Sequence, residues 1–385
     1  MRWDLGFHGG ACVRDTSDRD LVSDQISHMV PRYVGGHANV RVLVVCSFMD
    51  ATVEISFLKP AASSPDDIQV AVLDERTLQI MEAEGRSIDI VLHLQKTTHL
   101  VLCRYFGEHY DRLLAAARSA GIPVITFLDD DLLNVPLETG NDVFLYFQQP
   151  HRRDVLRRAV ADAELLIVST PQLGTSLAGL RNGKPLYVLP IYRSVEKQEL
   201  ALIAPPDEKE KVIGYMASQS HADDFALYVP GLTRFLERRT DFRFEFFGTI
   251  SPPTAFEEFG DRIYRHPKAH SYEEFQEKLR RLRWTVGLAP LRNSPFNANK
   301  ADTKWVEYTL ASIPTVASES NVYAVPLNAQ ACLSADADTL EPVLHRIVDA
   351  PQERRDLLCR SEKLLATKYP VEQHLALLIG TLRSL

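Results

Sequence analysis

Short apolar runs that alternate with helical segments are the feature that most constrains how this chain folds. In the first half, the runs show the continuous hydrophobicity of strands buried on both faces: residues 42–46, 70–73, 88–92, 100–103, 124–128 and 165–168. Helical patterns lie between several of them, and the clearest covers 110–120, with Leu113, Leu114 and Ala117 on one side and Gly121 as its stop. Such alternation is typical of a parallel, doubly wound α/β sheet.

The same alternation restarts after a break at 193–211, which carries Pro205-Pro206 and a charged run. Strands are predicted at 212–213, 242–247, 285–289 and 315–316, and helices at 225–236, 272–282, 304–311, 339–350 and 352–369. Pro230 either kinks the first of these helices or starts it afresh. A last helix is predicted to begin near Val371, just after Pro370.

These patterns predict two Rossmann-like α/β domains that face a central cleft. We expect an irregular N-terminal extension at 1–40, a first domain at 41–200, a second domain at 207–370, and a C-terminal helix at 371–385. This last helix either stays with the second domain or crosses back to the first. The carboxyl ends of the strands should line the cleft, where such folds bind their ligands.

Charge and composition exclude several classes of protein. The net charge is −8 and no long basic tract occurs, which argues against a nucleic-acid partner. The five cysteines are scattered, with no CxxC spacing, which favours idle thiols in a reducing compartment. No apolar stretch of membrane-spanning length or apolar leader is visible, so we expect a cytoplasmic protein. The basic segment 278–284 is expected to be a solvated helix face, and contact with a membrane or lipid-linked acceptor is the alternative.

The most informative stretch runs from 287 to 318, where a buried strand leads into a polar loop and then a helix that Asp302 can cap. The start of such a helix presents backbone N–H groups to anions, and Lys300 and Lys304 add positive charge there. A carboxylate at Glu307 suits a vicinal diol such as a ribose. The alternative is a surface helix with solvated lysines and an exposed glutamate.

This stretch resembles the donor-binding segment of family 4-type glycosyltransferases of the GT-B fold, and especially a bacterial surface-polysaccharide subgroup. The matching letters here are GLAPL, FN, two lysines, EY and SIPTVAS. The resemblance implies that two positions eight residues apart hold the sugar and the ribose. They fall on Asn299, where the family has an acidic residue, and on Glu307.

The resemblance extends over about 41–370 and implies two further donor contacts. The strand at 212–213 runs into a loop of small residues with Ser218, Ser220 and His221, which lets the backbone approach a diphosphate. The family often has Arg and Lys here, so Lys300 is expected to meet the phosphate charge. The next strand ends at Gly248, in a turn that commonly lies near the nucleobase.

Three adjacent carboxylates, Asp129, Asp130 and Asp131, follow the strand at 124–128. They are interpreted as acceptor-binding or base residues of the first domain, as a metal site for a diphosphate, or as a solvated turn with a helix cap. We favour the acceptor role, because the donor motifs lie in the other half and a metal here would be far from the diphosphate. Arg104 follows the preceding strand and either faces the cleft or forms a surface ion pair.

The sequence therefore predicts a glycosyltransferase that moves a sugar from a nucleotide-diphosphate sugar to a hydroxyl of a glycan or lipid-linked acceptor. Asp129 and Asp130 are the expected catalytic residues, and Ser218, His221, Gly248, Asn299, Lys300, Lys304 and Glu307 are the expected donor contacts. No metal or further cofactor is expected. The alternatives are a sugar-nucleotide epimerase on the same fold and a non-catalytic binding partner.

Overall fold

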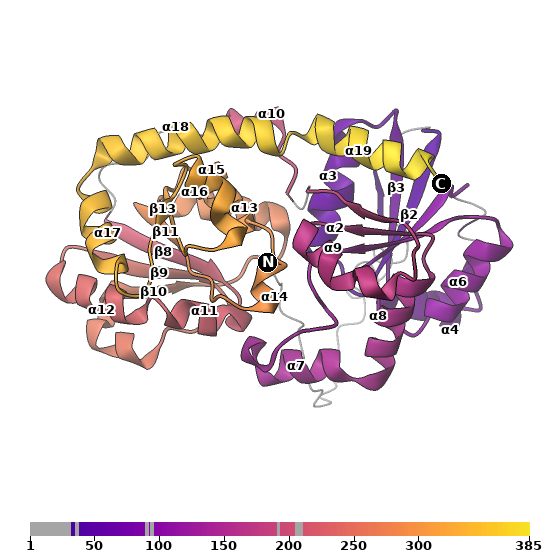
Figure 1. Ribbon diagram of the computed structural model, residues 1–385, viewed down its shortest axis with the longest axis horizontal. Coiled ribbons are helices and arrows are strands. Elements are labelled where there is room, and N and C mark those ends of the chain that lie inside the picture. Colours follow the sequence, from indigo (N-terminus) through magenta and orange to yellow (C-terminus); the bar gives the residue numbers. More distant parts are fainter. Residues whose placement is uncertain (1–31, 35–37, 89–91, 93–95, 191–192, 205–210) are drawn as a thin grey trace, which may run out of the picture.

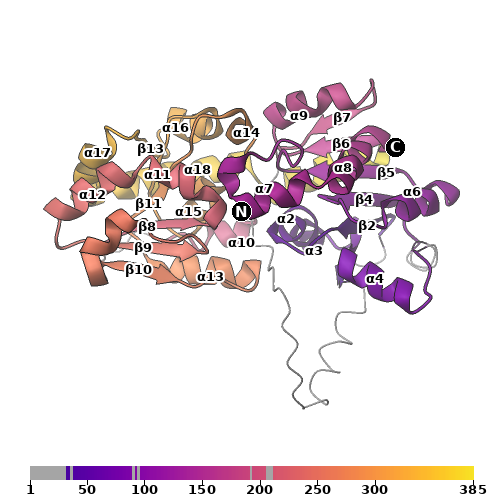
Figure 2. The same ribbon diagram turned by 90° about the horizontal axis from the view of Figure 1, so that it is seen from below.

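A computed structural model describes residues 32–34, 38–88, 92, 96–190, 193–204 and 211–385. Most of the N-terminal extension expected at 1–40, and most of the strand expected at 88–92, lie outside the described residues. Figure 1 shows two α/β domains side by side, each with its strands between helices. Figure 2 shows the same pair from below, with α10 (Lys197–Leu200) and α2 (Ala51–Val53) near the junction.

In the described part of the chain, the first sheet has seven strands in the order β1-β3-β2-β4-β5-β6-β7. Only β1 is antiparallel to its neighbour, so the rest form the parallel sheet that the apolar runs predict. The strands are β1 (Arg32–Val34), β2 (Val40–Cys46), β3 (Ile68–Asp74), β4 (His99–Cys103), β5 (Val124–Leu128), β6 (Leu165–Val168) and β7 (Leu186–Val188).

Helices cover both faces of this sheet, as a parallel sheet requires. A π-helical turn, η1 (Glu54–Leu58), joins α2 to α3. The helices of the domain are α2, α3 (Lys59–Ser63), α4 (Glu75–Ala83), α6 (Tyr110–Ser119), α7 (Asn141–Gln148), α8 (Pro150–Asp162) and α9 (Pro171–Leu177), with 3₁₀ turns at η2 (Leu137–Thr139) and η3 (Ala178–Leu180).

The second sheet is parallel among the described residues, in the order β10-β9-β8-β11-β12-β13. Its strands are β8 (Val212–Ala217), β9 (Arg243–Gly248), β10 (Ile263–His266), β11 (Val286–Ala289), β12 (Thr315–Ala317) and β13 (Leu333–Ser334). Two parallel α/β domains are the fold class that the sequence predicts, and the prediction is confirmed.

The helices of the second domain are α11 (Ala222–Ala226), α12 (Val229–Arg238), α13 (Tyr272–Leu282), α14 (Pro295–Ala298), α15 (Thr303–Leu310), α16 (Ala324–Asn328), α17 (Leu340–Val348) and α18 (Pro351–Lys368). Its 3₁₀ segments are η4 (Gln219–His221), η5 (Thr254–Arg262) and η6 (Asn321–Tyr323). The expected donor motif falls on α14, α15 and the loop between them.

Two local predictions need correction or refinement. The single helix expected at 225–236 is divided, and Pro230 lies in the first turn of α12, where its missing N–H costs no hydrogen bond. Asp302 does not cap α15 with its side chain. Its carboxylate instead accepts from Lys368 Nζ at 2.6 Å and from the Tyr369 hydroxyl at 2.7 Å, which fastens α18 to the start of α15.

The C-terminal helix α19 (Val371–Arg383) packs on the first domain, although α18 covers the second (Figure 1). Its apolar side, Val371, Leu375, Leu378 and Leu382, joins the core formed by β2, β3 and Phe57. Residues Val195 and Pro370 form a bridge where the chain crosses between the domains. The chain therefore crosses between the domains twice, near Val195 and near Pro370, and these two crossings lie side by side. Within the described residues, no helix is long and apolar enough to span a membrane.

Candidate active site

A cavity of about 70 Å³ lies between the two domains, at the carboxyl ends of their strands. The first domain contributes Arg104, Asp129, Asp130 and Thr139, and the second contributes the rest of the lining, which includes Ser218, Ser220, His221, Phe296, Lys300, Ala301, Thr303, Lys304 and Tyr323. Six of the nine expected site residues therefore meet here: Asp129, Asp130, Ser218, His221, Lys300 and Lys304. Arg104 and Ser220, which the sequence analysis also names, line the same cavity.

The positive side of the cavity comes from the start of α15. Ala301, Thr303 and Lys304 line the cavity, so the free N–H groups of the first helical turn lie beside it. Lys300 Nζ lies 5.0 Å from the centre of the Phe296 ring. Burial, with a smaller contribution from Lys300, lowers the pKa of Lys304 to about 8. Two lysines and a helix start thus line the same wall of the cavity, which is the arrangement that the sequence predicts for an anion site.

His221 lies beside these lysines and is held by Asp224. The distance from His221 Nδ1 to Asp224 Oδ2 is 2.9 Å, and both side chains are buried. The other carboxylate oxygen of Asp224 accepts from the backbone N–H of Arg292 at 3.0 Å and from Asn297 Nδ2 at 2.8 Å. Burial, followed by Lys304 and Lys300, lowers the pKa of His221 well below its usual value.

The negative side of the cavity comes from the end of β5. Asp129 is buried, and its Oδ2 accepts from the Thr52 hydroxyl at 2.8 Å. Arg104 Nη1 lies 3.4 Å from Asp129 Oδ1 and 3.3 Å from an oxygen of Asp50. Burial raises the pKa of Asp129; Arg104 partly offsets the rise, and Asp130 and Asp50 add to it. Arg104 has a φ of 50°, a strained backbone of the kind found at functional sites.

The acids and the lysines therefore share one cavity. The expectation that the acid cluster lies far from the donor motifs is wrong, because the two domains meet at these very loops. Asp130 is close enough to Lys304 to raise the pKa of that lysine slightly. Within the described residues, no group of three or more His, Cys, Asp or Glu side chains is arranged to hold a metal ion.

Asp131 and Asn299 form a contact between the domains outside the 70 Å³ cavity. Asn299 Nδ2 donates to Asp131 Oδ2 at 3.0 Å, and the Thr170 hydroxyl donates to the backbone carbonyl of Asn299 at 2.8 Å. Asp131 also accepts from Ser176 and from Asn134. Asn299, expected to contact the sugar, is thus buried in a contact with the first domain.

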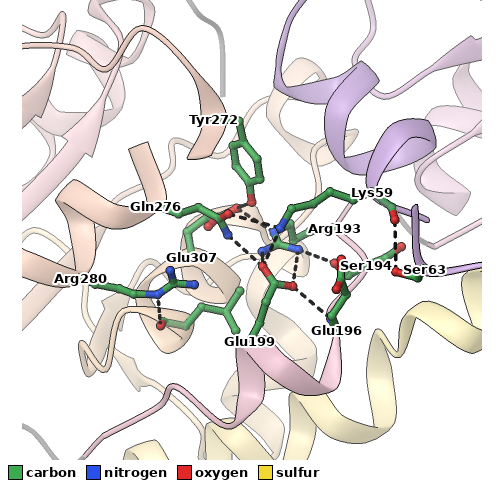
Figure 3. Close-up of polar contacts among 11 residues, drawn as sticks. Lys59, Ser63, Arg193, Ser194, Glu196, Glu199, Tyr272, Gln276, Arg280 and Glu307 are labelled. Carbon is green, nitrogen blue, oxygen red and sulfur yellow. Dashed lines mark hydrogen bonds and ion pairs between the residues drawn. The ribbon is translucent and has the colours of Figure 1, made fainter. Parts of the chain in front are cut away.

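Glu307 differs most from its expected place. It is 2% exposed, whereas the sequence suggested a carboxylate that points into the cleft. Its Oε1 accepts from Arg193 Nε at 3.0 Å and from the Tyr272 hydroxyl at 2.6 Å (Figure 3). Helix α15 is buried along most of its length, because α18 and α13 pack against it. Contact between Glu307 and a ribose stays a prediction.

Arg193 is the centre of a buried network that joins both domains to the segment between them. Its guanidinium also donates to Glu199 Oε1 at 2.7 Å, and Lys59 Nζ from the first domain lies 2.8 Å from the same oxygen. Gln276 Nε2 donates to it at 3.0 Å, and Figure 3 shows these side chains converging. Residues 193–211 are interpreted from the sequence as a linker, but Arg193, the first of them, is a buried part of the contact between the domains.

Gly248 ends β9 beside the loop that carries Ser218. Its φ is 121°, and a Cβ there would lie 2.3 Å from the carbonyl oxygen of Ala217, so only glycine fits. The next residues bond to the same loop, since Thr249 Oγ1 accepts from the Gln219 N–H at 3.1 Å. The turn after β9 thus shapes the loop of Ser218 and His221. Its expected contact with a nucleobase stays a prediction.

A second cavity of about 680 Å³ adjoins the first and shares Thr139, Ser220, Phe296 and Lys300 with it. Asp131, Asn134, Gln172, Thr175, Ser176 and Asn297 are among its other lining residues. Ligand sites usually measure ~300–1,000 Å³. The second cavity lies within this range, whereas the first alone is far below it, so a ligand of nucleotide-sugar size that contacts the lysines and acids must also occupy the second cavity or a wider cleft.

Solved structures share this fold. The structure aligns with Anabaena HepE in complex with UDP-glucose at a TM-score of 0.63 and 12% identity, over 90% of this chain and 100% of that chain. Sucrose-phosphate synthase from Thermosynechococcus elongatus gives 0.63 and 12%, over 90% and 98%. A glycosyltransferase from Rickettsia africae gives 0.60 and 11%, over 91% and 99%.

At these identities the likeness establishes the fold alone. The two-domain GT-B architecture expected from the sequence is therefore confirmed. The sequence matches no protein-family model and no curated protein.

Proposed function

We propose that this protein is a glycosyltransferase that moves a sugar from a nucleotide-diphosphate sugar to a hydroxyl of a glycan or lipid-linked acceptor. One observation carries the proposal: lysines and a helix start line one wall of an interdomain cavity, and carboxylates line the other wall of the same cavity. The GT-B fold, shared with solved structures that hold UDP or UDP-glucose, supports it.

In this proposal the diphosphate lies against Lys300, Lys304 and the start of α15. These groups stabilise the charge that grows on the diphosphate when its bond to the sugar breaks. Asp129 or Asp130 takes the proton of the acceptor hydroxyl, the hydroxyl oxygen bonds to the anomeric carbon, and the nucleoside diphosphate leaves. The resemblance to the family 4-type enzymes, and to their surface-polysaccharide subgroup, suggests polysaccharide biosynthesis as the setting.

The proposal is tested with a panel of UDP-, GDP-, ADP- and dTDP-sugars. A sugar nucleotide that binds should raise the melting temperature, because a ligand of the folded state stabilises that state. Transfer of the radiolabelled sugar to a saccharide or lipid-linked acceptor supports a transferase. Isomerised donor without acceptor indicates an epimerase, binding without turnover indicates a non-catalytic protein, and the absence of any binding contradicts the proposal.

A further inference from the structure

We propose that His221 and Asp224 act as a pair in which His221 takes up a proton when a diphosphate enters the cavity and then donates a hydrogen bond to it from Nε2. This inference rests on the proposed function and adds a further phosphate ligand that is charged only when the donor is bound. Asp224 is a positioning residue, because it acts through the imidazole.

The geometry fixes the orientation of the ring. Asp224 holds Nδ1 at 2.9 Å, and Asp224 is itself held by the Arg292 N–H and by Asn297 Nδ2. The carboxylate therefore accepts the Nδ1 proton, which leaves Nε2 as the ring nitrogen for a ligand in the cavity that His221 lines. A carboxylate behind an imidazole also stabilises the imidazolium once it forms.

The surrounding charges explain why the proton arrives with the ligand. Lys300 and Lys304 line the same wall, Tyr323 lies beside them, and Arg104, Asp129 and Asp130 face them from the other domain. In the empty cavity, burial and the two lysines keep the imidazole neutral, since they lower the pKa of His221. A diphosphate places negative charge among these cations and reverses their effect on the ring.

The sign of the pH dependence follows from this difference. The pKa of His221 is low in the empty cavity and is raised when the diphosphate is bound. Between these two values, binding takes up a proton, and donor affinity falls as the pH rises, by up to about tenfold per pH unit. The window begins below the ordinary histidine pKa, because the empty-state value lies well below it.

The test is titration calorimetry at pH 7.0 in buffers of different ionisation enthalpy, with the best binder among UDP-glucose, GDP-mannose, ADP-glucose and dTDP-glucose. Their diphosphates do not titrate near neutral pH, so any proton taken up belongs to the protein. Lys304, with a pKa of about 8, is mostly protonated there and contributes little. We expect net proton uptake by the wild-type protein.

Two variants separate this role from a structural one. His221→Gln should abolish the uptake and flatten the pH dependence of affinity between pH 6 and 7.5. Asp224→Asn offers Nδ1 a donor, so the neutral ring presents Nε2–H to the ligand; binding should persist while proton uptake is lost. Asp261→Asn is the control for the loss of one carboxylate, because Asp261 is an exposed residue of η5 in the same domain and lines neither cavity. It should keep the wild-type uptake.

Each outcome decides the matter. Donor binding without proton uptake, or uptake that survives in His221→Gln, overturns the role of His221 and leaves the proposed function standing. Unchanged uptake in a folded Asp224→Asn protein overturns the role of Asp224. If none of the four sugar nucleotides binds, the proposed function fails and this inference fails with it.

Discussion

Asn299 and Asp131 are joined across the cleft by a hydrogen bond of 3.0 Å from the amide Nδ2 to the carboxylate Oδ2. Asn299 stands where the resembling family has an acidic residue. A carboxylate at this position would face Asp131 and repel it, whereas an amide donates to it. Both residues line the larger cavity of about 680 Å³, so the contact holds the two domains together across that cavity.

Asn299→Asp should therefore open the cleft. Two facing carboxylates replace a buried hydrogen bond, and we expect a loss of about 1–3 kcal/mol in stability of the closed arrangement. Small-angle scattering should show a larger radius of gyration than for the wild type. Asn293→Asp adds the same charge at an exposed position of the same loop and should leave the radius unchanged. An unchanged radius in Asn299→Asp would mean that other contacts hold the domains.

The buried pair of Arg193 and Glu307 predicts a different effect of substitution. Glu307→Gln leaves Arg193 with Glu199 as its remaining carboxylate, so we expect a loss of about 3 kcal/mol in the free energy of unfolding, measured in urea. Glu277→Gln removes an exposed pair with Arg281 and should change stability by less than about 0.5 kcal/mol. Equal stability of the two variants would show that the network of Figure 3 contributes little.

These two contacts also show where prediction from the sequence ends. Periodicity identified β5 and α13 at their observed bounds, because buried strands and amphipathic helices leave a local pattern. The Asn299–Asp131 contact joins residues 168 positions apart and depends on how two domains meet. Glu307 was misplaced because Lys304 and Glu307, three positions apart, give α15 a polar side, and only the packing of α13 and α18 buries Glu307. Asp224 and Arg193 carry no motif of their own.

Lys304 should give donor binding a second pH dependence. Its pKa of about 8 means that its charge is present at neutral pH and is lost as the pH rises through 8. A bound diphosphate favours the charged form, so donor affinity should fall above pH 8 by up to about tenfold per pH unit. Lys304→Arg keeps the charge and should remove this fall. If affinity is flat from pH 7.5 to 9.5 in the wild type, Lys304 does not meet the phosphates.

Metal independence is also predicted, although the acids and the lysines share a cavity. Lys300, Lys304 and the start of α15 already supply positive charge for a diphosphate, so full activity is expected in excess EDTA. The measurement is turnover with and without the chelator. Activity that is lost and then restored by Mn²⁺ or Mg²⁺ would instead assign Asp129 and Asp130 to a metal-bound diphosphate.

The last prediction concerns Asp129 and Asp130 themselves. Both line the cavity opposite the lysines, and burial raises the pKa of Asp129, which suits a group that must accept a proton. Asp129→Asn and Asp130→Asn should each lower turnover, by about 10²–10⁴-fold for the residue that acts as the base. Donor affinity should change little in either variant, because the donor is held by the other wall.

Paired measurements of donor affinity and turnover decide between the roles of these acids. Asp142→Asn, at an exposed position of α7, is the control for loss of one carboxylate from the first domain and should match the wild type. Asp129 also accepts a hydrogen bond from Thr52 and lies beside Arg104, so its variant should lose some stability as well. Near-normal turnover in both variants would show that Asp129 and Asp130 have only a structural role in the turn after β5. A large loss of donor affinity in either variant would indicate that Asp129 and Asp130 contact the donor diphosphate, and it would overturn their assignment to the acceptor.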